Sequence, residues 1–389
     1  MTSFPDGFVW GTATAAHQVE GGNTNSDWWA WENAPDSVCA EPSGDACDHF
    51  NRYSDDIAML AELGFGAYRF SVEWARIEPS PGEFSQAMLD HYAAMARTCR
   101  EHGLEPIITL HHFTTPQWAA ADGGWENPAI AARFESYTER VADALADSAA
   151  RWCTINEPNI VSFIGYVVGV FPPGVQDKTR RDDVNRVLVD AHRRAVAAFR
   201  RASDAPVGLT LAMSEYEAAP GAEQALRRHL EDHEGPFLEA ASDDDFIGVQ
   251  TYAREIVGPD GGLFGLDDVE KTMVGWEYRP GALEVAIRRA HEATGVPILV
   301  TENGIATADD ARRIDFVHEA LKGVLRCVDS GIPVQGYCYW SALDNFEWAL
   351  GYHPTFGLIA VDRVTQQRRV KESARWLGTL AQANTLPPR

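Results

Sequence analysis

Two glutamates that follow apolar, strand-like runs could supply a pair of catalytic carboxyl groups. Glu157 lies in the segment Thr154–Pro158, and Glu302 lies in the segment Val300–Gly304. Two carboxyl groups that face one cavity can divide acid and base work, because their surroundings move their pKa values apart. Either segment alone is more often a solvated loop, so the remaining residues of the chain decide between the two interpretations.

A pair of this kind is suited to the hydrolysis of glycosidic bonds. One carboxyl group protonates the oxygen of the leaving group. The other, as a carboxylate, lies next to the sugar carbon on which positive charge develops. A separation of about 5 Å between the two groups gives a covalent intermediate and retention of configuration. A wider gap admits a water molecule and gives inversion. The sequence does not distinguish these two outcomes.

Other polar and aromatic residues also fall at or after the ends of strand-like runs. Arg69 and Tyr252 could hydrogen-bond one carboxylate and keep it ionised. Trp340 and Trp348 could stack on the apolar face of a sugar ring. The candidates for hydrogen bonds to sugar hydroxyl groups are Gln18, His112, Asn156 and Glu347.

Eight short apolar runs alternate with longer amphipathic stretches along the chain. The predicted strands span residues 8–15, 67–74, 106–113, 151–158, 207–213, 246–252, 297–304 and 334–343. The predicted helices span residues 48–64, 86–103, 128–148, 181–203, 223–242, 280–295, 309–330 and 370–384, and Asp48 is the expected N-cap of the first. This alternation indicates parallel strands that are joined by right-handed crossovers through helices.

Eight strand–helix units predict a closed (β/α)8 barrel, the TIM barrel of the α/β class, as a single domain over residues 1–389. An open doubly wound sheet is the alternative, but it would favour a glycine-rich phosphate loop after the first strand, which is missing. In a barrel, catalytic groups collect at the C-terminal ends of the strands, where the polar residues fall. Side chains alternate along a strand, so at most one of the adjacent His111 and His112 faces the interior.

Charge limits the partners of the chain. The sequence has 33 basic and 57 acidic side chains, a formal net charge of −24, which repels nucleic acids and anionic membranes. The N-terminus lacks the basic start and apolar run of a secretory signal, and no apolar segment approaches the roughly 18 residues of a membrane span. We therefore expect a cytoplasmic protein that binds neither nucleic acid nor membrane.

The cysteines and short motifs exclude several other chemistries. The six cysteines contain no C-x-x-C pair and are expected to be free thiols, with a bridge between Cys39 and Cys47 as the disfavoured alternative. Cys153 and Cys338 lie within predicted strands and are expected to be small core residues. The sequence has no H-E-x-x-H, no G-x-S-x-G and no P-loop, so we expect no metal ion and no other cofactor.

Six segments in a fixed order carry a resemblance to a known family. They are Thr12–Gly22, Tyr68–Ser71, Leu110–His112, Thr154–Pro158, Val300–Gly304 and Tyr339–Trp348. With these segments the chain resembles glycoside hydrolase family 1, the retaining β-glucosidases and β-galactosidases, over nearly its whole length. The resemblance implies an enzyme with a small-molecule glycoside as its substrate.

The resemblance also implies roles for individual residues. Glu157 matches the acid/base and Glu302 the nucleophile, with Arg69 and Tyr252 as the nucleophile's partners. Trp340 matches the floor of the site, and the peptide bond after it is often cis in the family. The residues that match those holding the non-reducing sugar are Gln18, His112, Asn156, Glu347 and Trp348. The Glu347–Trp348 pair, followed by His353–Thr355, implies a sugar without a phosphate group.

Several positions depart from the family pattern. Phe113 stands where Trp is frequent, Thr114–Thr115 replace an acidic and apolar pair, and Gln250–Thr251 precede Tyr252 where Asn-Tyr is common. The loops around 213–245 and 254–280 are expected to be shorter than in typical members.

Pro158 should hold Glu157 in an extended conformation.

The expected function is hydrolysis of terminal β-D-glucosides by double displacement, with β-galactosides or β-fucosides as alternative substrates. Two other functions stay open on the same fold. A transglycosylase would pass the sugar to an acceptor other than water, and a binding protein would hold the sugar without cleaving it.

Overall fold

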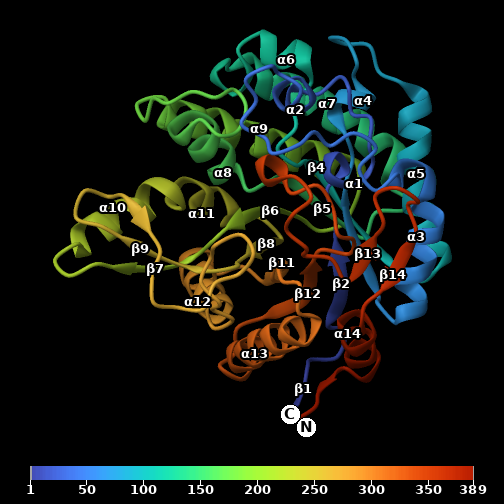
Figure 1. The fold of residues 1–389 in the computed structure, drawn as a ribbon. Helices are drawn as coiled ribbons and strands as arrows, with labels where there is room; N and C mark the ends of the chain where they lie inside the picture. The colour runs from blue at the N-terminus through green and yellow to red at the C-terminus, as the bar shows by residue number, and fades with distance from the viewer. Residues whose placement is uncertain (1, 389) are drawn as a thin grey trace.

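The predicted strands close into a parallel barrel at the centre of the molecule (Figure 1). The structure is a computed structural model and describes residues 2–388. Within that range the barrel strands, in spatial order, are β2 (Val9–Ala13), β3 (Ala67–Ser71), β4 (Glu105–His111), β5 (Arg151–Asn156), β6 (Val207–Ala212), β8 (Phe246–Gln250), β11 (Ile298–Asn303) and β12 (Val334–Trp340). Strand β12 pairs with β2 and closes the ring, so the predicted (β/α)8 barrel is confirmed.

All eight strands end one to three residues before their predicted ends. The apolar pattern runs on, but the backbone leaves the ladder to turn into the loops that surround the site. Glu157 shows the reason most clearly: it has φ 45° and ψ 58°, a left-handed conformation, and Pro158 is the first residue of helix α8 (Pro158–Phe163). The expected extended conformation of Glu157 is therefore wrong. Proline disfavours the right-handed helical region for the preceding residue, and the abrupt turn from strand to helix selects the left-handed one.

Helices surround the barrel, and most of them match the predicted ranges (Figure 1). They are α3 (His49–Leu63), α5 (Gln86–Glu101), α7 (Ala129–Leu145), α9 (Arg181–Ala202), α12 (Ala282–Thr294), α13 (Asp310–Asp329) and α14 (Glu372–Ala383). The predicted helix over 223–242 is two helices, α10 (Glu223–His233) and α11 (Gly235–Ala241), because Pro236 suits only a first turn. Asp48 occupies the N-cap of α3, but its side chain bonds to Asn51 and Arg52 instead of capping backbone N–H groups.

Shorter elements that lack a strong pattern complete the fold. Strands β7 (Glu215–Ala218), β9 (Arg254–Val257) and β10 (Leu263–Phe264) form a small sheet that projects with α10 on one side of the barrel (Figure 1). The other elements are α1 (Ala16–Val19), α2 (Asp27–Glu32), α4 (Trp74–Ile77), α6 (Gln117–Ala121), η1 (Gly124–Glu126), η2 (Ile164–Val168), η3 (Trp348–Leu350), the hairpin β13 (Ile359–Val361) with β14 (Arg368–Val370), and the pair β1 (Thr2–Ser3) with β15 (Thr385–Leu386).

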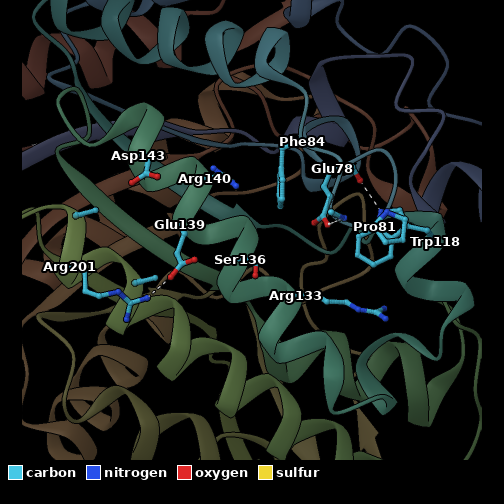
Figure 2. A pocket seen from close by; sticks show the side chains of 13 residues that line it. Glu78, Pro81, Phe84, Trp118, Arg133, Ser136, Glu139, Arg140, Asp143 and Arg201 are labelled. Carbon is cyan, nitrogen blue, oxygen red and sulfur yellow. Dashed lines mark hydrogen bonds and ion pairs between the residues drawn. The ribbon is translucent and has the colours of Figure 1, made fainter.

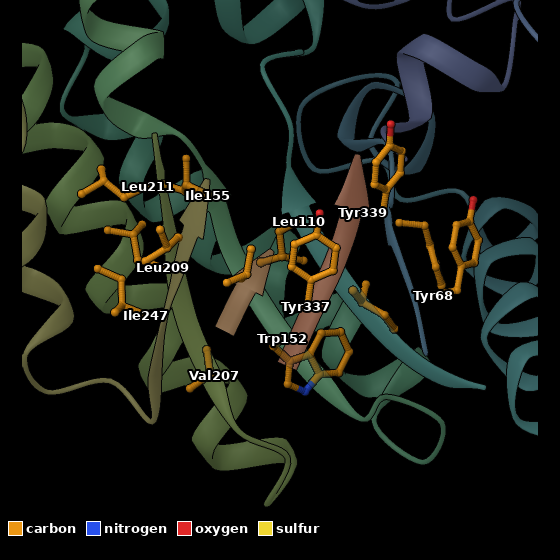
Figure 3. Packing of buried hydrophobic residues seen from close by; sticks show 14 of the residues in the cluster. Tyr68, Leu110, Trp152, Ile155, Val207, Leu209, Leu211, Ile247, Tyr337 and Tyr339 are labelled. Atoms are coloured by element: carbon orange, nitrogen blue, oxygen red, sulfur yellow. The ribbon is translucent and has the colours of Figure 1, made fainter. Parts of the chain in front are cut away.

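Two apolar layers hold the barrel. Outward-facing residues such as Trp152, Leu209 and Ile247 pack in one cluster with the surrounding helices (Figure 3). A second cluster includes Cys153 and Cys338, so their expected place in the core is confirmed. All six cysteines are free thiols, as expected. No helix between residues 2 and 388 is long and apolar enough to cross a membrane.

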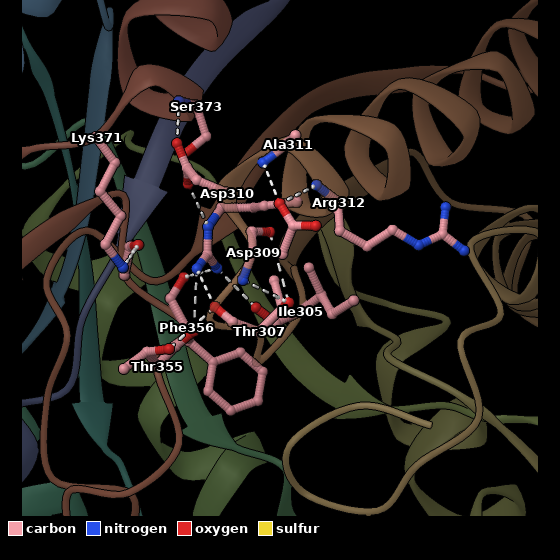
Figure 4. A network of polar contacts seen from close by, with 12 residues as sticks. Ile305, Thr307, Asp309, Asp310, Ala311, Arg312, Thr355, Phe356, Lys371 and Ser373 are labelled. Atoms are coloured by element: carbon pink, nitrogen blue, oxygen red, sulfur yellow. Dashed lines mark hydrogen bonds and ion pairs between the residues drawn. The ribbon is translucent and has the colours of Figure 1, made fainter. Parts of the chain in front are cut away.

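A buried arginine at the start of α13 joins the loops that follow two barrel strands. The guanidinium group of Arg313 is 1% exposed and donates to five acceptors besides Asp310. These acceptors are the backbone oxygens of Ile305, Thr307, Thr355 and Phe356 and the hydroxyl group of Tyr339; the four backbone partners are shown in Figure 4. The loop after β11 and the loop that carries Phe356 are thereby held together.

We expect Arg313→Ala to lower the free energy of unfolding by about 3 kcal/mol, because it leaves several buried acceptors without a donor. Chemical denaturation measures this change. The matched control is Arg312→Ala, which removes a partly exposed cation paired with Glu270 and stacked on Tyr278, and should cost about 1 kcal/mol or less. Equal losses for the two variants would contradict the role of Arg313.

Candidate active site

A cavity of about 490 Å³ opens at the C-terminal ends of the barrel strands and contains both predicted glutamates. Glu302 lies on β11, and Glu157 follows β5 directly. Only 9% of Glu157 and 3% of Glu302 is exposed. Other predicted residues that line the same cavity are His112, Tyr252, Trp340, Glu347 and Trp348. The barrel therefore brings together side chains that are up to 236 positions apart in the sequence (348 − 112).

Glu302 is surrounded by hydrogen-bond donors. Arg69 Nη1 donates to Oε1 at 2.6 Å, and Gln250 Nε2 donates to the same oxygen at 2.8 Å. The Tyr252 hydroxyl group donates to Oε2 at 2.6 Å. Burial raises the pKa of Glu302, but the Arg69 charge and the Tyr252 hydrogen bond counteract it. These donors favour the ionised carboxylate.

Glu157 has the opposite environment. Within residues 2–388 only burial and neighbouring charges shift its pKa, and no hydrogen-bond donor contributes. Burial, and then the negative charge of Glu302, raise the pKa of Glu157 well above its ordinary value, and Arg69 only partly opposes them. Because Glu302 keeps its charge more easily, Glu157 is the member of the pair that holds the proton.

Asn156, Arg69 and Gln18 lie just behind the cavity wall. Asn156 Oδ1 accepts hydrogen bonds from Arg69 Nη2 at 2.6 Å and Gln250 Nε2 at 2.9 Å, while its Nδ2 has no partner within the described residues. Gln18 Nε2 donates to the backbone oxygen of Phe346 at 2.8 Å and reaches Glu347 Oε2 at 3.5 Å. These three side chains contact residues that line the cavity.

The remaining predicted residues form one wall of the cavity. The ring of His112 stacks on Trp340 at 5.7 Å and on Trp348 at 6.2 Å between ring centroids. Burial, followed by the Arg69 charge, lowers the pKa of His112 well below its ordinary value, so the ring is neutral. Burial and the charge of Glu302 raise the pKa of Glu347 to about 8. A protonated Glu347 can both donate to a sugar hydroxyl group and accept from it.

Several detailed expectations can be compared with the geometry. His111 does not line this cavity and packs edge-on against Trp125 at 5.1 Å, whereas His112 lines it, as the alternation of side chains requires. The Trp340–Ser341 peptide bond is cis, as the resemblance implied. Gln250 was noted in the sequence only as a departure from a pattern, yet it contacts both Asn156 and Glu302. Its place as the last residue of β8 was the signal that could have identified it.

A more voluminous cavity, about 670 Å³, lies on the outer helices and lacks this chemistry (Figure 2). It is lined by α7 and α9 together with Glu78, Phe84 and Trp118. Two of its cations already have protein partners: Arg201 pairs with Glu139 at 2.8 Å, and Arg133 lies over the Trp118 ring. The cavity at the strand ends is therefore the better candidate for an active site.

Comparison with known proteins agrees with the site. The model of a family described as "Glycosyl hydrolase family 1" matches residues 1–246 and 265–386. The chain belongs to glycoside hydrolase family 1. A relative, β-glucosidase A of Thermotoga maritima, is 33% identical over 442 positions that cover 99% of each chain. As this protein has 389 residues, at least 53 of those positions (442 − 389) have no counterpart in it.

Solved structures of family 1 members share the whole fold. The crystal structure of β-glycosidase BGL167 is 44% identical, with a TM-score of 0.93 and coverage of 99% of this chain and 98% of that one. The β-glucosidase of Thermotoga maritima in complex with cyclophellitol is 31% identical, with a TM-score of 0.94 and full coverage of both chains. The chain is therefore a glycoside hydrolase with the barrel of its family.

We expect Gln250→Leu to lower kcat/KM about tenfold, because it removes a charge-assisted hydrogen bond to Glu302. Loss of a donor to the ionised form raises the pKa of Glu302, so the acid limb of the pH profile should move to higher pH. The control is Gln224→Leu on α10, away from the cavity. An unchanged acid limb with reduced activity would show that Gln250 acts only on packing.

Proposed function

We propose that this glycoside hydrolase is a retaining β-glycosidase that releases terminal, non-reducing β-D-glucosyl residues from small, unphosphorylated glycosides. The observation that carries the proposal is the pair of buried carboxyl groups in one cavity with unequal surroundings. The donors around Glu302 suit a nucleophile, and the raised pKa of Glu157 suits a proton donor. The similarity to enzymes named β-glucosidase supports glucose as the sugar.

The reaction takes two steps. In the first, Glu302 attacks the anomeric carbon while Glu157 gives its proton to the glycosidic oxygen, and the aglycone leaves. The sugar is then bound to Glu302 as an ester, and Glu157 is ionised. In the second, Glu157 takes a proton from water, the water oxygen attacks the anomeric carbon, and the bond to Glu302 breaks. Two inversions give overall retention.

The side chains around the expected sugar position favour a sugar without a phosphate group. His112, Trp340 and Trp348 offer flat surfaces, and Gln18, Asn156 and Glu347 supply or orient polar groups for hydroxyls. Among the described residues that line the cavity there is no Lys or Arg to bind a phosphate, and the ionised Glu302 would repel one. We assign galactose and fucose as the alternative sugars, because the same polar groups can bond to their hydroxyls.

We also propose that residues 1–389 act as one catalytic domain. The small sheet of β7, β9 and β10 is built from loops between barrel strands, and β1 pairs with β15 to join the two ends of the chain. The cytoplasmic location stays a prediction from the sequence.

We expect Glu302→Ala and Glu157→Ala to lose activity in different ways. Without the nucleophile, Glu302→Ala should lose turnover of every glycoside by about 10⁶-fold. Glu157→Ala should lose about 10²- to 10⁴-fold on alkyl glycosides, because these leaving groups need a proton. It should keep fast glycosyl-enzyme formation with dinitrophenyl glycosides, and azide should accelerate release by entering the space of the missing acid. Steady-state and burst kinetics measure these effects.

The control for both variants is Glu292→Ala, which replaces an exposed glutamate on α12. A panel of nitrophenyl glycosides identifies the sugar and the anomer. Product analysis with added alcohols separates a hydrolase, which yields mainly free sugar, from a transglycosylase. Near-normal rates for Glu302→Ala would refute the assigned roles, and binding of glycosides without nitrophenol release would indicate a binding protein.

A further inference from the structure

A third cavity, of about 470 Å³, lies behind one wall of the active-site cavity. Phe113 lines both cavities, and its ring also contacts Trp348 at 5.3 Å between ring centroids. The other lining residues come from α2, α6, η1, α8 and η2 and from the chain that follows them. Helices α2 and α6 lie side by side here (Figure 1). Apart from Phe113, the two cavities share no lining residue among those that the structure describes.

Aromatic rings and prolines form much of the lining of this third cavity. They are Trp31, Phe113, Trp125, Tyr166, Pro172 and Pro173. The indole nitrogens of Trp31 and Trp125 are buried, so neither donor is available to a ligand in the cavity. Six aromatic rings within residues 2–388 have an arginine guanidinium group over one face, and none of the six lines this cavity. The rings of the cavity therefore offer negative faces that no protein cation occupies.

The charged residues that line the third cavity are two acids. Asp27 Oδ1 accepts hydrogen bonds from the backbone N–H groups of Trp28 and Thr115, each at 2.8 Å, whereas Oδ2 accepts none within the described residues. Burial raises the pKa of Asp27 to about 7, and only backbone N–H groups oppose this shift. Glu126 pairs with Arg180 at 2.8 Å, but Arg180 does not line the cavity. Asp27 thus lacks a positively charged partner.

This lining disfavours an anion or a sugar as the ligand. An anion would meet two acids, and no Lys or Arg of the described residues lines the cavity to bind it. A sugar needs several hydrogen-bond partners, but the uncharged polar side chains are already bonded. Thr115 Oγ1 hydrogen-bonds with His111 Nε2 at 3.3 Å. Gln117 Nε2 donates to the backbone oxygen of Thr24 at 2.9 Å. A ligand with a positive charge and an apolar body suits both the rings and Asp27.

We propose that the third cavity binds a small organic ammonium ion, whose charge pairs with Asp27 and whose methyl or methylene groups pack on the surrounding rings. The site is distinct from the active-site cavity, from which the Phe113 ring separates it. This inference does not depend on the proposed hydrolysis, because binding is measured on the enzyme without a glycoside.

The first test compares two ligands of similar shape by calorimetric titration. Tetramethylammonium chloride carries the positive charge, and tert-butanol is its uncharged counterpart. The titrations are made well above pH 7, where Asp27 is ionised, and at constant ionic strength set with sodium chloride. We expect tetramethylammonium to bind at least about tenfold more tightly than tert-butanol, because only the cation gains from the carboxylate and the ring faces.

Charge variants locate the bound cation. Asp27→Asn keeps an oxygen that can accept from the two backbone N–H groups but removes the charge, so it should weaken tetramethylammonium binding about tenfold. The matched control is Asp329→Asn, which removes an exposed charge at the end of α13 and should leave the affinity unchanged. Glu347→Gln, in the active-site cavity, should also leave it unchanged. Thermal unfolding confirms that each variant folds.

A second pair of variants tests the aromatic faces without changing a charge. Trp31→Leu should weaken binding of tetramethylammonium about fivefold, because it replaces a ring with an aliphatic side chain. Trp31→Phe keeps a ring at this position and should restore most of the affinity.

The pH dependence of binding provides a further test. Between about pH 6 and pH 8 the affinity for tetramethylammonium should rise about tenfold, because the ionised fraction of Asp27 rises across its pKa of about 7. The other titratable groups at the cavity are Glu126, paired with Arg180, Tyr166, whose pKa burial raises, and His111, whose pKa burial lowers to about 3. In Asp27→Asn the rise should be absent.

Three outcomes would overturn the inference. Equal affinities for tetramethylammonium and tert-butanol would show that the cavity does not recognise the charge. If Glu347→Gln weakens binding and Asp27→Asn does not, the cation binds in the active-site cavity. If Asp329→Asn weakens binding as much as Asp27→Asn, the cation responds only to the overall negative charge of the chain. Failure to hydrolyse any glucoside would instead refute the proposed function and leave this site in place.

Discussion

The buried ion pair between Arg69 and Glu302 is the interaction on which the site depends. Arg69 is fully buried, and the pair is 2.6 Å long. Removing two charges from water is costly, and their attraction offsets the cost only when the remaining polar atoms are also bonded. Asn156, Gln250 and Tyr252 provide most of those bonds. Burial raises the pKa of both Glu157 and Glu347, and the charge retained on Glu302 raises both further.

This interaction can form only because the barrel joins distant strands. Arg69 lies on β3, Asn156 on β5, Gln250 on β8 and Glu302 on β11, so four strands contribute to one hydrogen-bonded network around the Glu302 carboxylate. Contacts outside the cavity also join distant parts of the chain, because Arg313 connects the loop after β11 to the loop that carries Phe356. A local loss of packing in any of these strands would therefore displace the two carboxyl groups in the cavity.

The sequence predicted the barrel and the meeting of the two glutamates in one cavity, because both rest on strong patterns. Eight apolar runs alternating with helices leave few other folds, and polar residues at strand ends identify the site. The prediction was weaker where tertiary contacts override local preference. The left-handed conformation of Glu157, the contact of Gln250 with Glu302, and the pairing of β7 with β9 all depend on neighbours distant in sequence.

The pairing of β1 with β15 determines where a tether, a fused protein or a solid support could be attached to the enzyme. Both strands lie at the N-terminal end of the barrel, where the chain ends meet (Figure 1), whereas the cavity opens at the C-terminal ends of the strands. A tether or a fused protein at either terminus would therefore extend from the base. On a solid support the mouth would face the solution, with its path to substrate unobstructed.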